Sequence, residues 1–109
     1  MKGKIVLVPF PFTDLTSAKL RPALVIYEGD KDVILVFISS KIPSELSEAD
    51  ILITKNHSGF KTAGLKVDSV IRIDKIATVL KDLIVGEIGE INKELRKEVN
   101  LKLKKILEV

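Results

Sequence analysis

The chain contains no cysteine and only one histidine among its 109 residues. Without cysteine it has no disulfide, no thiolate nucleophile and no cysteine-ligated metal. A single histidine is also too few for the usual transition-metal ligand sets. We therefore expect no metal and no cofactor.

Aromatic residues make up 5% of the chain, and tryptophan is absent. The core must therefore be aliphatic, and binding by several stacked aromatic side chains is not expected. Long apolar runs are lacking too: the one in residues 1–12 is short and interrupted by Pro9 and Pro11. It is too short for a signal peptide or a membrane span, so we expect a cytoplasmic protein with no membrane contact.

Hydrophobic residues form 46% of the sequence and charged residues 30%, a balance typical of a folded globule. The length suits one domain, residues 1–109, without an internal linker or repeat. The net charge of +3 leans mildly toward anionic partners, but it does not by itself establish nucleic-acid binding.

The apolar runs are short and rich in β-branched residues, which predicts strands rather than helices. The turn-like stretch Glu28–Asp32 is too short for a crossover helix, so the strands on either side should form an antiparallel hairpin. The predicted strands are Ile5–Val8, Ala23–Tyr27, Val33–Ile38, Ile51–Ile53, Val67–Ile73 and Ile76–Leu80.

The tail from Glu90 to Val109 carries apolar residues at helical spacing, which predicts a helix of about 15 residues with Asn92 as its N-cap. Several strands are apolar at successive positions, so both of their faces need cover. One helix is too short to supply all of it. We therefore predict a mainly β fold, a small SH3-like barrel of antiparallel strands with a C-terminal helix, that forms a homodimer across an apolar sheet face.

Arg21 stands directly in front of an apolar run, in the stretch KLRPALVIY. An unpaired charge is costly to bury, so its guanidinium must either lean out to water or be held for a partner. Pro22 restricts Arg21 to extended backbone and thereby limits how far the guanidinium can move. Hydroxyl groups end the next strand at Ser39 and Ser40.

Four segments taken in order resemble the MazF/PemK-type endoribonuclease toxins over nearly the whole chain. They are KGKIVLVPFPFTDL, KLRPALVI, VILVFISSKI and AGLKVDSVIRIDKIATV. The resemblance implies a dimeric SH3-like barrel that cleaves single-stranded RNA at short motifs without metal and is neutralised by a cognate antitoxin, expected to be acidic. The family's catalytic arginine falls on Arg21 and its catalytic serine or threonine on Ser39, with Ser40 adjacent.

In the reaction typical of that family, the ribose 2′-hydroxyl attacks the neighbouring phosphate and leaves a 2′,3′-cyclic phosphate and a 5′-hydroxyl end. A guanidinium that donates two hydrogen bonds to the phosphate oxygens would stabilise their growing charge. Ser39 would donate to the same phosphate or to a displaced oxygen. His57 is the only imidazole and a candidate for proton transfer.

Family members commonly carry Gly-Asp before the first strand, whereas this chain has Gly3-Lys4. Asp14, in the following loop, is a candidate replacement for the missing acidic group. Candidate RNA contacts are basic or aromatic loop residues, which would neutralise phosphates or stack a base. They are Lys19, Lys41, Lys61 and Phe12, with Phe10 as an alternative to Phe12.

Two other functions are compatible with the sequence. The barrel is then either a non-catalytic module that binds RNA or an antitoxin-like peptide, or an inhibitor of a cellular enzyme such as gyrase. Because small barrels host unrelated activities, the fold alone does not separate these alternatives.

Overall fold

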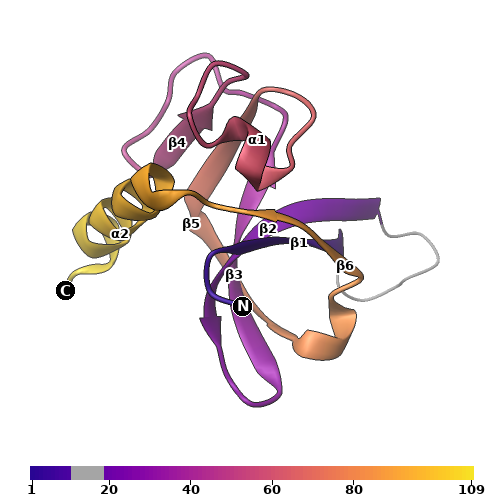
Figure 1. Cartoon of the computed structure of the whole chain (residues 1–109). Helices are drawn as coiled ribbons and strands as arrows, with labels where there is room; N and C mark the ends of the chain where they lie inside the picture. The colour runs from indigo at the N-terminus through magenta and orange to yellow at the C-terminus, as the bar shows by residue number, and fades with distance from the viewer. Residues whose placement is uncertain (11–18) are drawn as a thin grey trace.

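The computed structural model describes residues 1–10 and 19–109, which form a curled antiparallel sheet crossed by a helix (Figure 1). Within this part, six strands are ordered β4-β5-β3-β2-β1-β6 across the sheet. The expected mainly β fold with a C-terminal helix is confirmed, as a curled half-barrel. The strands are β1 (Lys4–Phe10), β2 (Lys19–Glu28), β3 (Asp32–Ser39), β4 (Asp50–Ile53), β5 (Ser69–Leu80) and β6 (Gly86–Glu90).

The predicted hairpin is confirmed, and two of the predicted strands form one continuous strand. β2 and β3 pair antiparallel on either side of the short turn. The two apolar runs expected between residues 67 and 80 are one strand, β5. Its register against β3 shifts, because Val36 pairs with Ile76 but Phe37 pairs with Arg72. Residues 73–75 are left without a partner on β3, and such a bulge bends a strand and redirects its side chains.

Each face of the sheet carries its own apolar cluster, which explains the strands that are apolar at successive positions. Successive residues of a strand point to opposite faces. Leu24 packs in a cluster with Leu95 and Val99 of the C-terminal helix. Its neighbours Ala23 and Val25 belong to a second cluster, which includes no residue of that helix.

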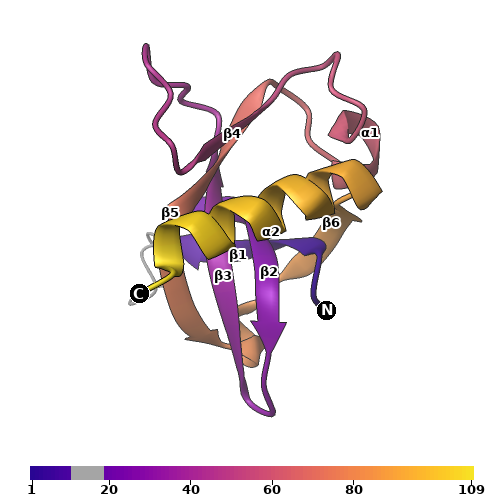
Figure 2. The ribbon, with the colours of Figure 1, turned by 90° about the vertical axis from the view of Figure 1, so that its left-hand side faces the viewer.

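The C-terminal helix α2 (Lys93–Leu107) lies across the strands in Figure 2 and has the predicted length of 15 residues. Asn92 is its N-cap, as predicted, because the side-chain Oδ1 accepts a hydrogen bond from the backbone N–H of Leu95 at 2.9 Å. This bond satisfies one of the backbone donors that every helix start leaves open. In residues 1–10 and 19–109, no helix combines the length and apolar character needed to cross a membrane.

Three short elements were not predicted from the sequence. They are α1 (Phe60–Ala63), the 3₁₀ turn η1 (Lys81–Leu83) and β6. The β6 sequence GEIGE contains one apolar residue between glycines and glutamates, so its composition resembles a loop. It becomes a strand because it pairs antiparallel with β1 along Lys4–Leu7.

Candidate functional site

Arg21 and Ser39 lie on neighbouring strands and project from the same face of the sheet. Ala23 of β2 pairs with Phe37 of β3. Arg21 and Ser39 each lie two residues beyond that pair, toward the same end of the two strands. Because alternate residues of a strand share a face, all four side chains are on one side. This is the side of Ala23, away from α2.

Two cavities open beside these residues, and Arg21, Ile38 and Ser39 line both of them. The larger has a volume of about 490 Å³ and is called the Phe37 cavity here; Phe10, Phe37, Arg72 and residues 74–77 complete it. The other, of about 400 Å³, is called the Leu65 cavity, and it extends over Ser40, residues 64–67 and Ile88. Both volumes fall within the range of ordinary ligand sites.

Arg21 is exposed and is held by an aromatic side chain. Its guanidinium carbon lies 5.8 Å from the centroid of the Phe10 ring, a cation–π distance. Phe10 in turn meets Phe37 edge-on, with ring centroids 5.6 Å apart. No salt bridge within the described part of the chain involves Arg21. Its charge is therefore available to an anion in either cavity.

Ser39 has an oriented hydroxyl. Its Oγ accepts a hydrogen bond from the backbone N–H of Lys41 at 3.0 Å. A hydroxyl has one proton to donate and two lone pairs, so this bond uses a lone pair and leaves the proton for another acceptor. Ser40, the neighbouring candidate, lines the Leu65 cavity but not the Phe37 cavity.

Sequence reasoning missed four charged residues that line the cavities: Lys66, Arg72, Asp74 and Lys75. A usable signal existed for Arg72. It is the only charged residue in the apolar run SVIRI. Like Arg21, it would be costly to bury without a partner, so it indicates a paired or functional charge. Asp74 and Lys75 reach the Phe37 cavity from the bulge of β5, and nothing in the residue pattern marks that bulge.

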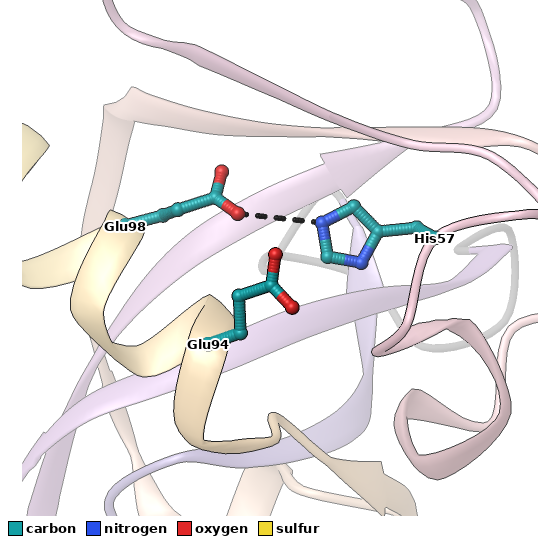
Figure 3. Close-up of side chains that lie close together, drawn as sticks. All are labelled: His57, Glu94 and Glu98. Carbon is teal, nitrogen blue, oxygen red and sulfur yellow. Dashed lines mark hydrogen bonds and ion pairs between the residues drawn. The ribbon is translucent and has the colours of Figure 1, made fainter.

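His57 lies against α2 (Figure 3). It lines neither of the two cavities. Its Nδ1 accepts a hydrogen bond from the backbone N–H of Gly59 at 2.9 Å. Because a backbone N–H can only donate, the proton of the neutral ring must be on Nε2. That nitrogen lies 3.4 Å from Oε1 of Glu98. The structure thus places the imidazole apart from Arg21 and Ser39.

His57, Glu94 and Glu98 form a cluster with three potential metal-ligating atoms within 4.8 Å of one another (Figure 3). The lack of cysteine and the single histidine predict no metal, but glutamates spaced one helical turn apart are potential ligands as well. The hydrogen bonds oppose a metal here, because Nε2 carries the ring proton and Ser58 donates to Glu94 at 2.6 Å. We interpret the cluster as a clamp that joins the loop before α1 to the start of α2.

The predicted basic and aromatic contacts are scattered. Lys19 begins β2, Lys41 follows β3 and Lys61 lies in α1, and none of the three lines either cavity. Phe12 and Asp14 lie outside the described residues, so their predicted roles stay predictions.

Lys4, at the position where family members commonly have an acidic residue, points to β6. Its Nζ lies 3.3 Å from Glu90 and 3.5 Å from Glu87. The hydrogen bond to Glu90, together with the nearby charge of Glu87, raises the pKa of Lys4 above its ordinary value. Lys4 lines neither cavity, so its charge supports the pairing of β1 with β6.

Solved structures with the same fold come from toxin systems. The Mycobacterium tuberculosis toxin MazF-mt6 superposes with a TM-score of 0.75 at 14% identity, over 97% of each chain. A mycobacterial endoribonuclease in complex with its cognate antitoxin gives 0.72 at 18% identity, over 100% of this chain and 95% of that one. MazF from Deinococcus radiodurans gives 0.70 at 18% identity, over 99% and 96%. At these identities the likeness establishes the fold.

The sequence itself carries the family assignment. Residues 1–107 match the family described as PemK-like, MazF-like toxin of type II toxin–antitoxin systems. No curated protein matches the chain significantly. The family match nevertheless spans nearly the whole chain and agrees with the fold. The chain therefore belongs to the PemK-like, MazF-like toxins of type II toxin–antitoxin systems.

Proposed function

We propose that the chain is an endoribonuclease toxin that cleaves single-stranded RNA, such as mRNA in the cytoplasm, at the junction of the Phe37 and Leu65 cavities. The observation that carries this proposal is the shared placement of Arg21 and Ser39, which line both cavities from one sheet face. An extended strand can place one nucleotide in each cavity and the phosphate between them beside these two side chains.

The proposed reaction is an internal transfer. The ribose 2′-oxygen gives up its proton and forms a bond to phosphorus as the bond to the 5′-oxygen breaks, and the departing 5′-oxygen gains a proton. The products are a 2′,3′-cyclic phosphate and a 5′-hydroxyl. Negative charge grows on the nonbridging oxygens in the transition state. The exposed guanidinium of Arg21 donates to these oxygens in a forked geometry, and such charge-assisted hydrogen bonds stabilise that state.

Ser39 supplies a further donor. Since Lys41 N–H already occupies one lone pair of Oγ, the hydroxyl proton is directed to another acceptor, which we assign as a phosphate oxygen. The hydroxyl is a stabilising group and not a nucleophile, because no carboxylate or imidazole among the described residues forms a hydrogen bond with it. Loss of one such donor typically lowers the rate by about 100- to 1,000-fold.

Proton transfer requires a group other than Arg21, because a guanidinium offers hydrogen-bond donors and no acceptor. Asp74 is the only carboxylate among the described residues that line either cavity. We assign it the role of base for the 2′-hydroxyl. The assignment distinguishes this chain from one that relies on an acidic residue at position 4, where Lys4 is paired with β6.

Two kinds of protein partner accompany the proposed activity. A second copy of the chain would cover the exposed apolar side chains of Tyr27 and Leu80 on one face of the sheet. An antitoxin is the other, since a mycobacterial structure of the same fold is described as a complex with its cognate antitoxin. With a net charge of +3 and two arginines in the Phe37 cavity, the toxin favours an acidic antitoxin segment.

The test is cleavage of a long single-stranded RNA in EDTA by the wild type, Arg21→Ala and Ser39→Ala. We expect the wild type to cleave, and its fragments to accept a 5′-phosphate from a kinase without prior dephosphorylation. Arg96→Gln serves as the control, because Arg96 lies on α2 outside both cavities. Equal cleavage by all four proteins would identify a contaminating nuclease and contradict the proposal.

A further inference from the structure

A second arginine faces the Phe37 cavity from the far side of β3. Phe37 pairs with Ala23 on β2 and with Arg72 on β5, and Arg72 pairs in turn with Asp50 on β4. Residues directly opposite one another in paired strands share a face. Arg72 therefore projects from the same face as Ala23 and Phe37, and hence as Arg21.

Asp50 is a buried carboxylate with Arg72 as its charged partner. Its side chain is only 2% exposed. One oxygen, Oδ2, accepts a hydrogen bond from the backbone N–H of Ser47 at 2.9 Å. The other, Oδ1, lies 2.9 Å from Nε of Arg72. A buried carboxylate without such a partner would be strongly unfavourable.

The contact with Asp50 uses only one corner of the guanidinium. Nε of Arg72 is buried, and it is poorly aligned with Oδ1 for a hydrogen bond, so the pair is held mainly by charge. The Arg72 side chain is nevertheless 32% exposed and borders the Phe37 cavity. No hydrogen bond from its two Nη groups to a described residue is present. The donors best suited to a forked contact with a phosphate therefore remain available.

We propose that Arg72 is a second phosphate-binding residue, held in place by Asp50. It binds the RNA phosphate next to the phosphate at which the chain is cleaved. The naming of the ligand rests on the proposed endoribonuclease function. Arg21 acts on the phosphate at the junction of the two cavities. Arg72 binds the following phosphate across the Phe37 cavity, and so fixes the direction in which the strand runs.

The spacing of the two arginines suits this division. β2 and β5 flank β3, and neighbouring strands lie about 4.8 Å apart, so the two backbones are separated by roughly 10 Å across the sheet. Arg21 also lies two residues along β2 from Ala23, the residue that is in register with Phe37 and Arg72. Two long side chains at that separation can each reach a different phosphate. Lys75 adds positive charge to the same cavity wall.

A purely structural role for Arg72, as the counter-charge of Asp50, makes a different prediction. It would affect stability without affecting RNA binding. To separate the two roles, the ion pair is removed as a unit in Asp50→Asn/Arg72→Gln. The asparagine keeps a side-chain oxygen that accepts from Ser47 N–H. Because no unpaired charge remains buried, we expect the double variant to fold.

Binding is measured with a short random-sequence RNA whose 2′-hydroxyls are methylated, so that it cannot be cleaved. The dissociation constant is followed against salt, because each phosphate contact to a single strand contributes about 0.7 to the slope of log K against log salt. We expect Asp50→Asn/Arg72→Gln to bind about 10-fold more weakly than the wild type and to lose about 0.7 from this slope. Arg72→Lys keeps the charge but not the forked donors, so it should keep the slope and lose less affinity.

Arg96→Gln is the matched control, since it removes one arginine charge on α2, outside both cavities. It should leave the slope unchanged. In cleavage assays with long RNA, the double variant should raise KM and leave kcat nearly intact, whereas Arg21→Gln should lower kcat. A folded double variant with wild-type affinity and slope would overturn the proposal. Loss of slope by the double variant, with a wild type that binds RNA but never cleaves it, would uphold the phosphate site and reject the endoribonuclease.

Discussion

The guanidinium of Arg21 lies against the ring of Phe10, with 5.8 Å between the guanidinium carbon and the ring centroid. The two residues come from paired strands, β2 and β1, and the ring is itself braced edge-on by Phe37 of β3. Three strands thus determine where the guanidinium points. In an enzyme that acts by electrostatic stabilisation, such fixed placement lowers the cost of reorganisation during the reaction.

Phe10→Leu should weaken catalysis through Arg21 while leaving the arginine in place. An exposed cation–π contact contributes about 0.5–1 kcal/mol, so we expect the single-turnover cleavage rate to fall by about 2- to 5-fold. Phe60→Leu is the control, because Phe60 lies in α1 and packs on the cluster beneath α2. If both variants cleave at the wild-type rate, the ring does not orient the guanidinium.

Gly64→Ala should destabilise the wall of the Leu65 cavity. Gly64 ends α1 with a φ of +74°, and an added Cβ would collide with the carbonyl oxygen of Ile88 in β6. Strained backbone alone costs about 1–3 kcal/mol, and the clash adds to it. We expect the free energy of unfolding in urea to fall by more than about 2 kcal/mol.

Gly86→Ala is the matched control for this change. A Cβ at Gly86 would meet no atom within 4 Å, and its backbone does not need a positive φ. It should shift the free energy of unfolding by less than about 0.5 kcal/mol, as most surface substitutions do. Equal destabilisation by the two variants would show that the approach of α1 to β6 does not determine the effect.

The parts of the fold that could be predicted are those with a strong local signal. The hairpin around Glu28–Asp32 and the helix capped by Asn92 follow from turn composition and from apolar spacing, and both are confirmed. β6 could not be predicted, because GEIGE gains its strand conformation only from pairing with β1. The same holds for the β5 bulge, which arises from the register of a long curled strand against two partners.

In the candidate site, too, residues with a local sequence signal could be predicted, and residues placed by distant contacts could not. A family resemblance indicates Arg21 and Ser39, and the charge beside an apolar run also indicates Arg21; the structure brings both residues to the same two cavities. Arg72 offered the same kind of signal, but its partner Asp50 is 22 positions away in the chain and comes into register only through β4. His57 was a candidate because of its chemistry, yet its position depends on the loop-to-helix clamp with Glu98.

Lys4→Asp, which restores the residue type common in the family, should destabilise this chain. The new carboxylate would face Glu87 and Glu90, which now pair with the lysine. The thermal midpoint should drop at neutral pH and low salt, and the loss should shrink as salt screens the repulsion. Lys2→Asp is the control, since Lys2 forms no salt bridge in the described part of the chain. A higher cleavage rate for Lys4→Asp would show instead that position 4 serves the reaction.

Leu80→Glu should convert the proposed homodimer into a monomer. Tyr27 pairs through Ile34 with Thr78, two residues before Leu80, so the side chains share a face. Tyr27 is 50% exposed and Leu80 is 55% exposed. A buried charge in an apolar interface is strongly unfavourable. Sedimentation at micromolar concentration should show a dimer for the wild type and a monomer for the variant.

The control for this prediction is Leu101→Glu, because Leu101 is a similar exposed leucine on the outer side of α2. It should leave the dimer intact. A wild type that sediments only as a monomer at micromolar concentration would contradict the dimer itself. Dissociation by Leu101→Glu but not by Leu80→Glu would move the interface to the helix.

Glu28→Gln should change how stability depends on pH at the acidic end. The hydrogen bond from Lys81, with a second from the N-terminal amine, lowers the pKa of Glu28 from 4.5 to about 2. A lowered carboxyl pKa stabilises the fold at pH values above the unfolded pKa, and this contribution is lost as the pH falls toward the folded value. The urea midpoint of Glu28→Gln should therefore lie below that of the wild type at neutral pH, and the gap should close between pH 4.5 and about 2.

Glu45→Gln, at an exposed glutamate with no salt bridge in the described part of the chain, should show no such gap. A gap for Glu28→Gln that persists unchanged into acid would mean that the loss of stability does not come from the charge that pairs Glu28 of β2 with Lys81 of η1.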